Sequence, residues 1–197
     1  MDTQTIQVYD QKAASIAARH RGNKPNRLND LILTYFHTGE LTADVGCGSG
    51  RDTEWLHHQG IPTIGYDGSE GMLAEARLLN PTAEFHLAFL PDLAEIPDAH
   101  YFNVLCNAVL MHLDKNETPS ALQNLARILQ PKGRLVVSFR GSQDEAEREA
   151  DGRLYTRVQV DEMTAWMVAA GLKVLVAETL PDPVRSGGEW SIVVAER

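Results

Sequence analysis

The sequence predicts an α/β protein with a doubly wound, mostly parallel seven-stranded sheet, its last strand antiparallel and helices on both faces. Short apolar runs alternate with helix-length amphipathic segments through the middle of the chain, which is typical of parallel strands joined by helical crossovers. Near the end, two apolar runs are separated only by a turn-rich segment, which predicts an antiparallel pair. The 197 residues, 43% of them hydrophobic, suffice for one domain with a single core.

Two helices are expected before the sheet. Apolar residues from Ile6 to Ile16 recur at steps of three or four, which marks one helix face. The same periodicity runs from Leu28 to Tyr35, after a break at residues 22–25, and Gly39 is expected to end that second helix. We expect residues 1–38 to cap a cofactor site, and residues 41–197 to form the sheet core of the same single domain.

Seven apolar runs are short enough to be buried strands. They are Leu41–Val45, Ile61–Tyr66, Ala83–Ala88, Phe102–Asn107, Leu135–Phe139, Leu172–Ala177 and Trp190–Ala195. The last two are separated by a segment that contains Pro181, Pro183, Gly187 and Gly188.

Helical periodicity fills the longer connections between the first six runs. One helix carries Met72 and Leu79. Another has Thr118 as its expected N-cap and Pro119 in its first helical position, with Pro131 and Gly133 as stop signals. A third helix is expected to end at Gly171.

Composition argues against several function classes. The net charge of −9 disfavours a nucleic-acid partner. A mild basic patch is present, but it fits a solvated helix end and loop better than a nucleic-acid site; it comprises Arg19, His20, Arg21, Lys24 and Arg27. The two cysteines, Cys47 and Cys106, form no CxxC pair, so we expect buried thiols in a reducing compartment and no metal site.

Neither a membrane span nor a secretory signal is predicted. No apolar run approaches the roughly 18 residues of a membrane helix. The opening MDTQTIQVYDQ lacks a basic segment followed by an apolar stretch. We therefore expect a cytoplasmic protein, and the sequence says nothing about its oligomeric state.

A glycine-rich turn follows the first expected strand, in the string ADVGCGSGRD at residues 43–52. Glycines at 46, 48 and 50 allow backbone to approach a ligand closely, and the following helix offers free N–H groups. Such a turn also serves dinucleotides, but Arg51 stands where their fingerprint needs a third glycine. Asp44, two residues before the first glycine, is placed to organise an ammonium group.

A second acidic residue, Asp67, ends the second expected strand, about 20 residues after the glycines. At that spacing a carboxylate can accept hydrogen bonds from both hydroxyls of a ribose. An acid that complements a helix dipole is the alternative interpretation of Asp67 alone. Together with the glycine turn, Asp67 favours a nucleoside-containing cofactor.

Four strings in order resemble the class I S-adenosylmethionine-dependent methyltransferases, most closely the small bacterial members without large insertions. They are DVGCGSGRDTEWL, YDGSEGMLAEAR, FNVLCNAVLMHL and ILQPKGRLVVSF. The resemblance spans Leu41 to Phe139, and for the rest of the chain it is only architectural. It implies a Rossmann-like methyltransferase fold, S-adenosylmethionine as cofactor, S-adenosylhomocysteine as product and a methyltransferase activity.

The resemblance also implies cofactor-binding residues. The glycine turn would pass under the methionine portion and ribose, Asp44 would help hold the ammonium end, and Asp67 would bind the ribose hydroxyls. The full set of expected cofactor residues is Tyr9, Asp44, Gly46, Cys47, Gly48, Gly50, Arg51, Asp67, Gly68, Met72, Ala88, Phe89, Asn107 and Ala108.

The chain departs from the family pattern after the third expected strand. The family usually has a small residue followed by an acid that bonds the adenine amino group. Here Ala88 is followed by Phe89. Adenine would then be held by apolar packing and backbone groups.

Acceptor residues are less well defined by the sequence. His112 is a candidate base, although a packed histidine is the alternative. Arg140 and Tyr155 are further candidates, and the arginines at 140, 153 and 157 either recognise an acceptor carboxylate or phosphate or pair with nearby acids. The acidic stretch from Asp144 to Asp151 suggests a surface segment or lid. Tyr9 fits either a cofactor contact or core packing, and Trp190 most simply starts a buried strand.

The sequence thus predicts in-line methyl transfer to a small-molecule acceptor, because no insertion supplies a macromolecule-recognition domain. The cofactor carries the reactivity, so no catalytic triad is needed. Two alternatives remain open at this point: a nicotinamide-dependent oxidoreductase on a similar fold, and a non-catalytic S-adenosylmethionine-binding protein.

Overall fold

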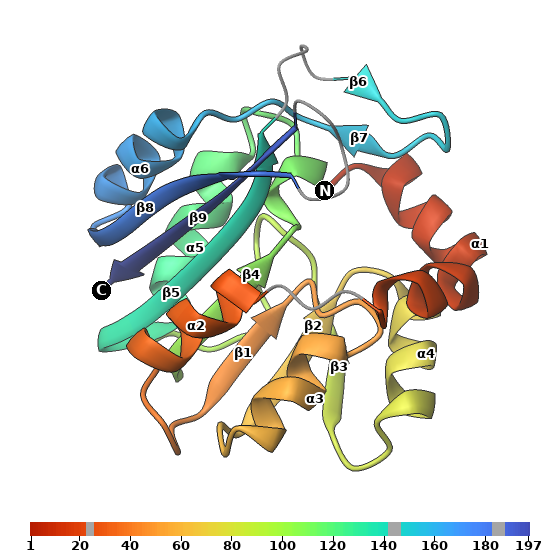
Figure 1. Cartoon of the computed structure of the whole chain (residues 1–197), viewed down its shortest axis with the longest axis horizontal. Helices are drawn as coiled ribbons and strands as arrows, with labels where there is room; N and C mark the ends of the chain where they lie inside the picture. The colour runs from red at the N-terminus through yellow and green to blue at the C-terminus, as the bar shows by residue number, and fades with distance from the viewer. Residues whose placement is uncertain (23–25, 142–146, 183–187) are drawn as a thin grey trace.

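The computed structural model describes residues 1–22, 26–141, 147–182 and 188–197. Its main sheet has seven strands in the order β3-β2-β1-β4-β5-β9-β8 (Figure 1). The strands are β1 (Thr42–Val45), β2 (Thr63–Asp67), β3 (Glu84–Leu87), β4 (Tyr101–Asn107), β5 (Leu129–Gly141), β8 (Lys173–Pro181) and β9 (Glu189–Glu196). Only β9 is reversed: it pairs antiparallel with β5 and with β8. The predicted fold class is confirmed.

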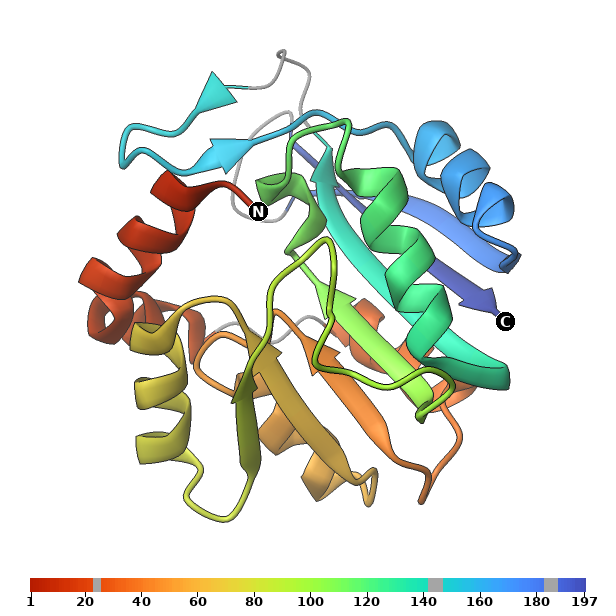
Figure 2. The ribbon, with the colours of Figure 1, turned by 180° about the vertical axis from the view of Figure 1, so that it is seen from behind.

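Helices cover both faces of this sheet. On one face, α2 (Asn26–Tyr35) and α3 (Arg51–His58) bury Leu31, Ile32 and Leu56 against β4, β5 and β9. On the other, α5 (Thr118–Ile128) and α6 (Val160–Ala169) bury Leu122 and Met163 in the largest core cluster. Figure 1 shows α2 and α3 in front of the sheet, and Figure 2 shows α5 and α6 covering the back.

Strand order fixes where a ligand can bind. From β1 the chain moves outward to β2 and β3, then crosses back to β4 and β5 on the other side of β1. The connections after β1 and β4 therefore diverge and leave a crevice at the carboxyl ends of the parallel strands.

The N-terminal helix α1 (Thr3–His20) borders this crevice (Figures 1 and 2). It packs on α4 (Glu70–Leu79) at Gly71, where a Cβ would lie 2.8 Å from the Asp10 backbone. Ser69, the N-cap of α4, donates to Asp10 Oδ1 at 2.6 Å. The helix kinks at Lys12 (φ −114°, ψ 15°).

A small hairpin lies beside α1 and was not predicted. It consists of β6 (Glu147–Arg148) and β7 (Leu154–Tyr155), which pair antiparallel. Thr5 Oγ1 accepts the Leu154 N–H at 2.9 Å, and Arg148 forms two hydrogen bonds with the Asp2 carboxylate. The β7 strand also lies against the short 3₁₀ helix η1 (Leu110–His112).

Two expected helix boundaries were wrong. The second helix ends at Tyr35, and Gly39 lies four residues later with φ +80°, in a turn. Helix α5 starts at Thr118 after Glu117, and the buried Thr118 hydroxyl has no partner, so it is not the N-cap. Lys24, most of the break at 22–25, most of the acidic stretch, Pro183 and Gly187 lie outside the described residues. None of the helices described is both long and apolar enough to cross a membrane.

Candidate active site

A cavity of about 570 Å³ opens along the carboxyl ends of the parallel strands. Its walls come from the turn after β1, the ends of β2, β4 and β5, helix α1, and residues of β7 and β9. It runs across the topological switch point between β1 and β4, where open α/β sheets bind their ligands.

The glycine turn after β1 shapes the floor of one end. Gly46 has φ +77°, and a Cβ there would lie 2.2 Å from Val109 Cγ2, so no other residue fits without displacing the chain after β4. Gly48, at φ +56°, also lines the cavity. Gly50 does not line it: its φ is +79°, and a Cβ would meet Asn80 and Phe85. Gly50 therefore allows close packing behind the turn.

Asp67, at the end of β2, presents a carboxylate to the same end of the cavity. Its Oδ2 accepts the Gly48 N–H and its Oδ1 the Ser69 N–H, both at 2.8 Å. Burial nevertheless raises the pKa of Asp67 above its ordinary value. The backbone thus fixes the carboxylate, while each oxygen retains lone-pair capacity for a further donor.

A chain of polar side chains crosses from α3 to β5. Arg51 forms a bidentate pair with Asp52, with both N–O distances 2.8 Å. Asp52 Oδ2 accepts from Asn107 Nδ2 at 2.7 Å, and Asn107 Oδ1 accepts from the Ser138 hydroxyl. All four residues line the cavity.

Asp44 lies behind this chain and does not line the cavity. Its exposed fraction is 1%, and its Oδ2 accepts from Thr53 Oγ1 at 2.7 Å. Burial, and secondarily the charge of Asp52, raise the pKa of Asp44 to about 7. Asp44 thus lies beneath the cavity wall, and its expected help in holding an ammonium group stays a prediction.

Most other expected cofactor residues do line the cavity; these are Tyr9, Cys47, Gly68, Met72, Ala88 and Ala108. Phe89 does not: its side chain is 41% exposed and lies against Gly68. Whether any of these residues binds a cofactor stays a prediction.

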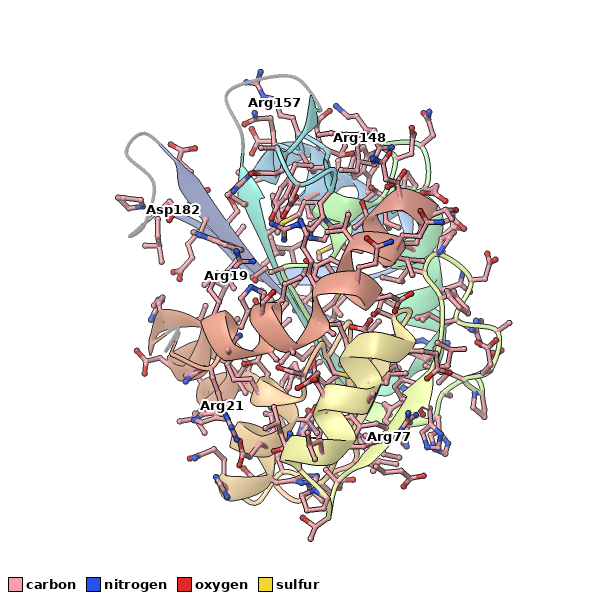
Figure 3. The ribbon with its side chains drawn as sticks, turned by 90° about the vertical axis from the view of Figure 1, so that its right-hand side faces the viewer. Arg19, Arg21, Arg77, Arg148, Arg157 and Asp182 are labelled. Carbon is pink, nitrogen blue, oxygen red and sulfur yellow. The ribbon has the colours of Figure 1, made fainter. Side chains whose placement is uncertain are left out.

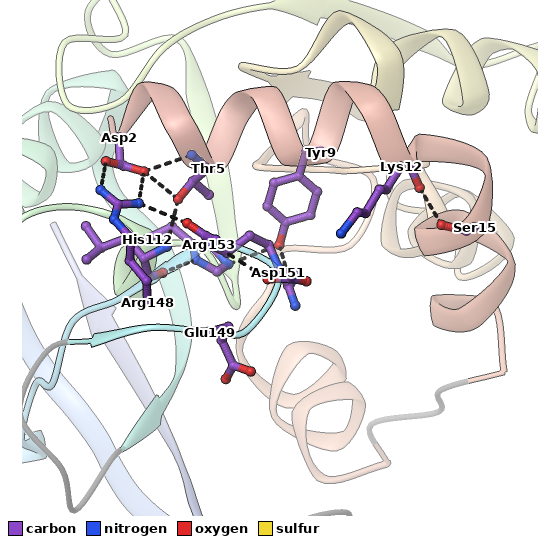
Figure 4. Close-up of polar contacts among 12 residues, drawn as sticks. Asp2, Thr5, Tyr9, Lys12, Ser15, His112, Arg148, Glu149, Asp151 and Arg153 are labelled. Carbon is purple, nitrogen blue, oxygen red and sulfur yellow. Dashed lines mark hydrogen bonds and ion pairs between the residues drawn. The ribbon is translucent and has the colours of Figure 1, made fainter.

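The opposite end of the cavity contains a hydrogen-bonded group of side chains from α1, η1 and the hairpin (Figure 4). His112 Nδ1 lies 2.7 Å from the Leu154 carbonyl oxygen, and its Nε2 lies 3.0 Å from the Tyr9 hydroxyl. Burial lowers the pKa of His112 to about 4, so the ring is neutral. Because a carbonyl only accepts, Nδ1 carries the hydrogen and Nε2 accepts from Tyr9.

Two arginines flank Tyr155 at this end. The Arg140 guanidinium lies 4.1 Å from the Tyr155 ring centroid and the Arg153 guanidinium 5.6 Å from it. Arg153 Nη1 donates to the Tyr9 hydroxyl at 3.2 Å. Both arginines, Tyr155 and His112 line the cavity. The fold thus brings together the three acceptor-site candidates His112, Arg140 and Tyr155.

Sequence reasoning missed Asp52, Ser138 and the position of Trp190 at the cavity wall. Asp52 had a signal, since an acid in the first turn after a glycine-rich loop is placed beside the ligand. Ser138 reaches this edge beside Asn107 through the parallel pairing of β4 with β5, and Trp190 reaches it through the pairing of β5 with β9.

Comparisons with known proteins find methyltransferases. A family model described as a methyltransferase domain matches residues 43–137. Over 155 residues the chain is 33% identical to a trans-aconitate 2-methyltransferase of Methylobacterium nodulans, a match covering 69% of this chain and 58% of that protein. An O-methyltransferase of Aspergillus sclerotiorum is 31% identical over 107 residues, covering 51% and 39%. The chain thus spans about half the length of the curated relatives it matches.

The fold is also found in solved structures. The 1,6-didemethyltoxoflavin-N1-methyltransferase of Burkholderia thailandensis, solved with its substrate and S-adenosylhomocysteine, superposes with a TM-score of 0.74. The match covers 100% of this chain and 91% of that chain at 18% identity. At this identity the likeness is one of fold alone.

Proposed function

Because the chain belongs to the class I S-adenosylmethionine-dependent methyltransferases, we propose that its cavity transfers a methyl group from that cofactor to a small-molecule acceptor. One observation carries the proposal: the glycine turn and Asp67 meet at one end of a cavity whose other end holds a separate group of polar side chains. One pocket thus offers a place for each reactant.

The residues at the first end fit the nucleoside part of the cofactor. Gly46 and Gly48 keep side chains out of the floor of the cavity, since a Cβ at Gly46 would clash with Val109. Asp67 is held by two backbone N–H groups with its oxygens still able to accept, which suits the two hydroxyls of a ribose. Gly68 and Met72 border the same end.

The charges at this end suit the amino-acid part of the cofactor. Asp52 and Asp67 face the cavity, Asp44 lies beneath it, and Arg51 is the matching cation. Acids therefore outnumber the cation here, which favours a ligand with positive charge. Burial is the main cause of the raised pKa of Asp44 and the charge of Asp52 a smaller one, and a cation nearby would lower that pKa.

When bound, S-adenosylmethionine supplies a methyl group made electrophilic by its sulfonium. The residues of this chain bind and orient the two reactants and limit access of water, which is the main contribution a protein makes to such a displacement. Asn107 is fixed by Asp52 and Ser138, so it can present its amide in one orientation. None of these roles requires a proton to leave the acceptor through the protein.

The acceptor is proposed to be a small molecule. The cavity of about 570 Å³ must hold both reactants, which leaves room for a compact acceptor only. The relative named as a trans-aconitate 2-methyltransferase makes trans-aconitate the first compound to test. Cytoplasmic localisation and the absence of a nucleic-acid partner stay predictions.

The test is ligand-dependent thermal stabilisation. S-adenosylhomocysteine should raise the melting temperature of the wild type, and Asp67→Ala should abolish the shift. Asp30→Ala is the matched control, because Asp30 is exposed on α2, away from the cavity. Equal stabilisation of wild type and Asp67→Ala would refute the assigned site. Saturable NAD stabilisation, with none from S-adenosylhomocysteine, would favour an oxidoreductase instead.

A further inference from the structure

We infer that the acceptor is a small organic carboxylate, held at the Tyr155 end of the cavity by Arg140 and Arg153. This inference rests on the proposed function and names the substrate class of the same site. It is carried by the arrangement of the two guanidinium groups and of the acids behind them.

Both arginines are withdrawn from solvent and still reach the cavity. The side chains of Arg140 and Arg153 are 12% and 8% exposed. Arginines that are this buried need partners, and each has a carboxylate: Arg140 pairs with Glu149 at 2.8 Å and Arg153 with Asp151 at 2.9 Å. Glu149 and Asp151 do not line the cavity, whereas both arginines do. The acids thus hold the guanidinium groups from behind.

The rings around the arginines fix the direction of their donors. Arg140 lies over the face of Tyr155, a contact that keeps the plane of its guanidinium group near the ring. Arg153 is held by its Nε on Asp151 and its Nη1 on Tyr9. A carboxylate beside Tyr155 would accept from donors whose directions are already fixed, which is the geometry in which arginine binds anions best.

Tyr9 and His112 serve as positioning residues for Arg153. The Leu154 carbonyl sets the tautomer of His112, and His112 Nε2 then takes the Tyr9 hydroxyl hydrogen (Figure 4). The Tyr9 oxygen is left with lone pairs, one of which receives Arg153 Nη1. In this chain Arg153 donates to Tyr9, and Tyr9 donates to His112. The chain accounts for a neutral, buried His112 that does not act as a base.

Charge balance favours a carboxylate over a phosphate. Glu149 and Asp151 do not line the cavity and already balance the charge of the two arginines, so the donors that face the cavity carry no excess positive charge. A singly charged, planar anion therefore fits better than a doubly charged phosphate monoester, which would need further cations nearby.

The experiment measures binding of matched acid and amide probes to the protein saturated with S-adenosylhomocysteine. The probes are butyrate and butyramide, benzoate and benzamide, and phenyl phosphate, and their binding is measured by calorimetry. At least one acid should bind roughly tenfold or more tightly than its amide, since hydrogen bonds to a charged group are the strong ones. Comparable affinity of acids and amides, tighter binding of phenyl phosphate, or no binding of any acid would overturn the inference.

Variants assign the effect to the two arginines. Arg140→Met and Arg153→Met should each weaken acid binding by roughly 10- to 100-fold and leave amide binding unaffected. Arg140→Lys should retain part of the affinity, which guards against misfolding of the methionine variant. Tyr9→Phe should reduce the acid-to-amide ratio several-fold, because it frees Arg153; a purely structural role would lower both affinities alike.

Two controls separate this inference from the proposed function. Arg77→Met, on α4 and outside the cavity (Figure 3), should bind acids like the wild type. S-adenosylhomocysteine should stabilise the wild type whether or not the acids bind. If it does not, the proposed function fails; if it does and the acids do not bind, only the carboxylate assignment fails.

Discussion

The two ends of the cavity hold charge by different means. At the β1–β2 end the backbone provides most of the structure: a glycine turn forms the floor of the cavity, and backbone N–H groups fix Asp67. At the Tyr155 end, side chains from α1, η1, β5 and β7 hold one another, and arginines face the cavity. Acids face the cavity at the first end, whereas at the second end the arginines face it and their paired acids do not, which suits a positively charged cofactor and an anionic acceptor.

The backbone-built end should be the less tolerant of substitution. In Gly46→Ala, the left-handed φ costs about 1–2 kcal/mol and the clash of the new methyl group with Val109 about 1–3 kcal/mol more. Urea denaturation should therefore show a loss of about 2–5 kcal/mol, the largest effect expected here. Gly60→Ala is the matched control, with φ +75° and nothing within 4 Å of its Cβ, and should lose only the conformational part. Equal losses in the two variants would mean that the turn can move away from Val109.

The two ends should also respond to pH in opposite directions. Asp44 has a folded pKa of about 7, above its unfolded value of about 3.9. The folded state therefore binds the extra proton, and this contribution to stability is lost as pH rises from about 4 to 7. His112 has a folded pKa of about 4, below its unfolded value of about 6.5. Here the unfolded state binds the extra proton, so stability is lost as pH falls over nearly the same window.

Single substitutions separate the two contributions, each expected to be about 3–4 kcal/mol across its window. Relative to the wild type, Asp44→Asn should make the free energy of unfolding increase more with pH between 4 and 7. His112→Gln should make it increase less, or decrease, over the same range. Denaturation midpoints at a series of pH values measure both slopes. Identical profiles for the two variants would contradict the opposite assignments.

The first end was predictable from the sequence because its residues are close together along the chain. The glycine turn, Asp67 and the strands that carry them follow from local periodicity and spacing. Asp44 and Gly50 belong to the same motif but do not line the cavity, and their roles toward the cofactor stay predictions. Successive side chains of a strand point to opposite faces of the sheet, and Asp44 points toward Thr53 of α3. Sequence spacing alone does not determine which face that is.

The second end was less predictable because only tertiary structure assembles it. Tyr9, His112, Arg140 and Tyr155 were each singled out, but nothing in the sequence indicated that they touch. Their contact depends on the β6–β7 hairpin, which is too short to give a periodic signal. Phe89 illustrates the same limit: its place after β3 was correct, while its exposure depends on how the following segment leaves the sheet.

A substitution at the junction between α1 and β7 should perturb the Tyr155 end of the cavity least. Thr5 Oγ1 accepts the Leu154 N–H, and the Leu154 carbonyl holds His112. Thr5→Val keeps the shape of the side chain but leaves that N–H without its acceptor, so stability should fall by about 1 kcal/mol and the Leu154 amide hydrogen should exchange faster. Thr34→Val, which removes a surface hydroxyl bonded to a helix carbonyl, should change stability by less than about 0.5 kcal/mol. Unchanged protection of the Leu154 amide would mean that β7 keeps its position without α1, and the arginine end would then be an independent unit rather than one completed by the N-terminal helix.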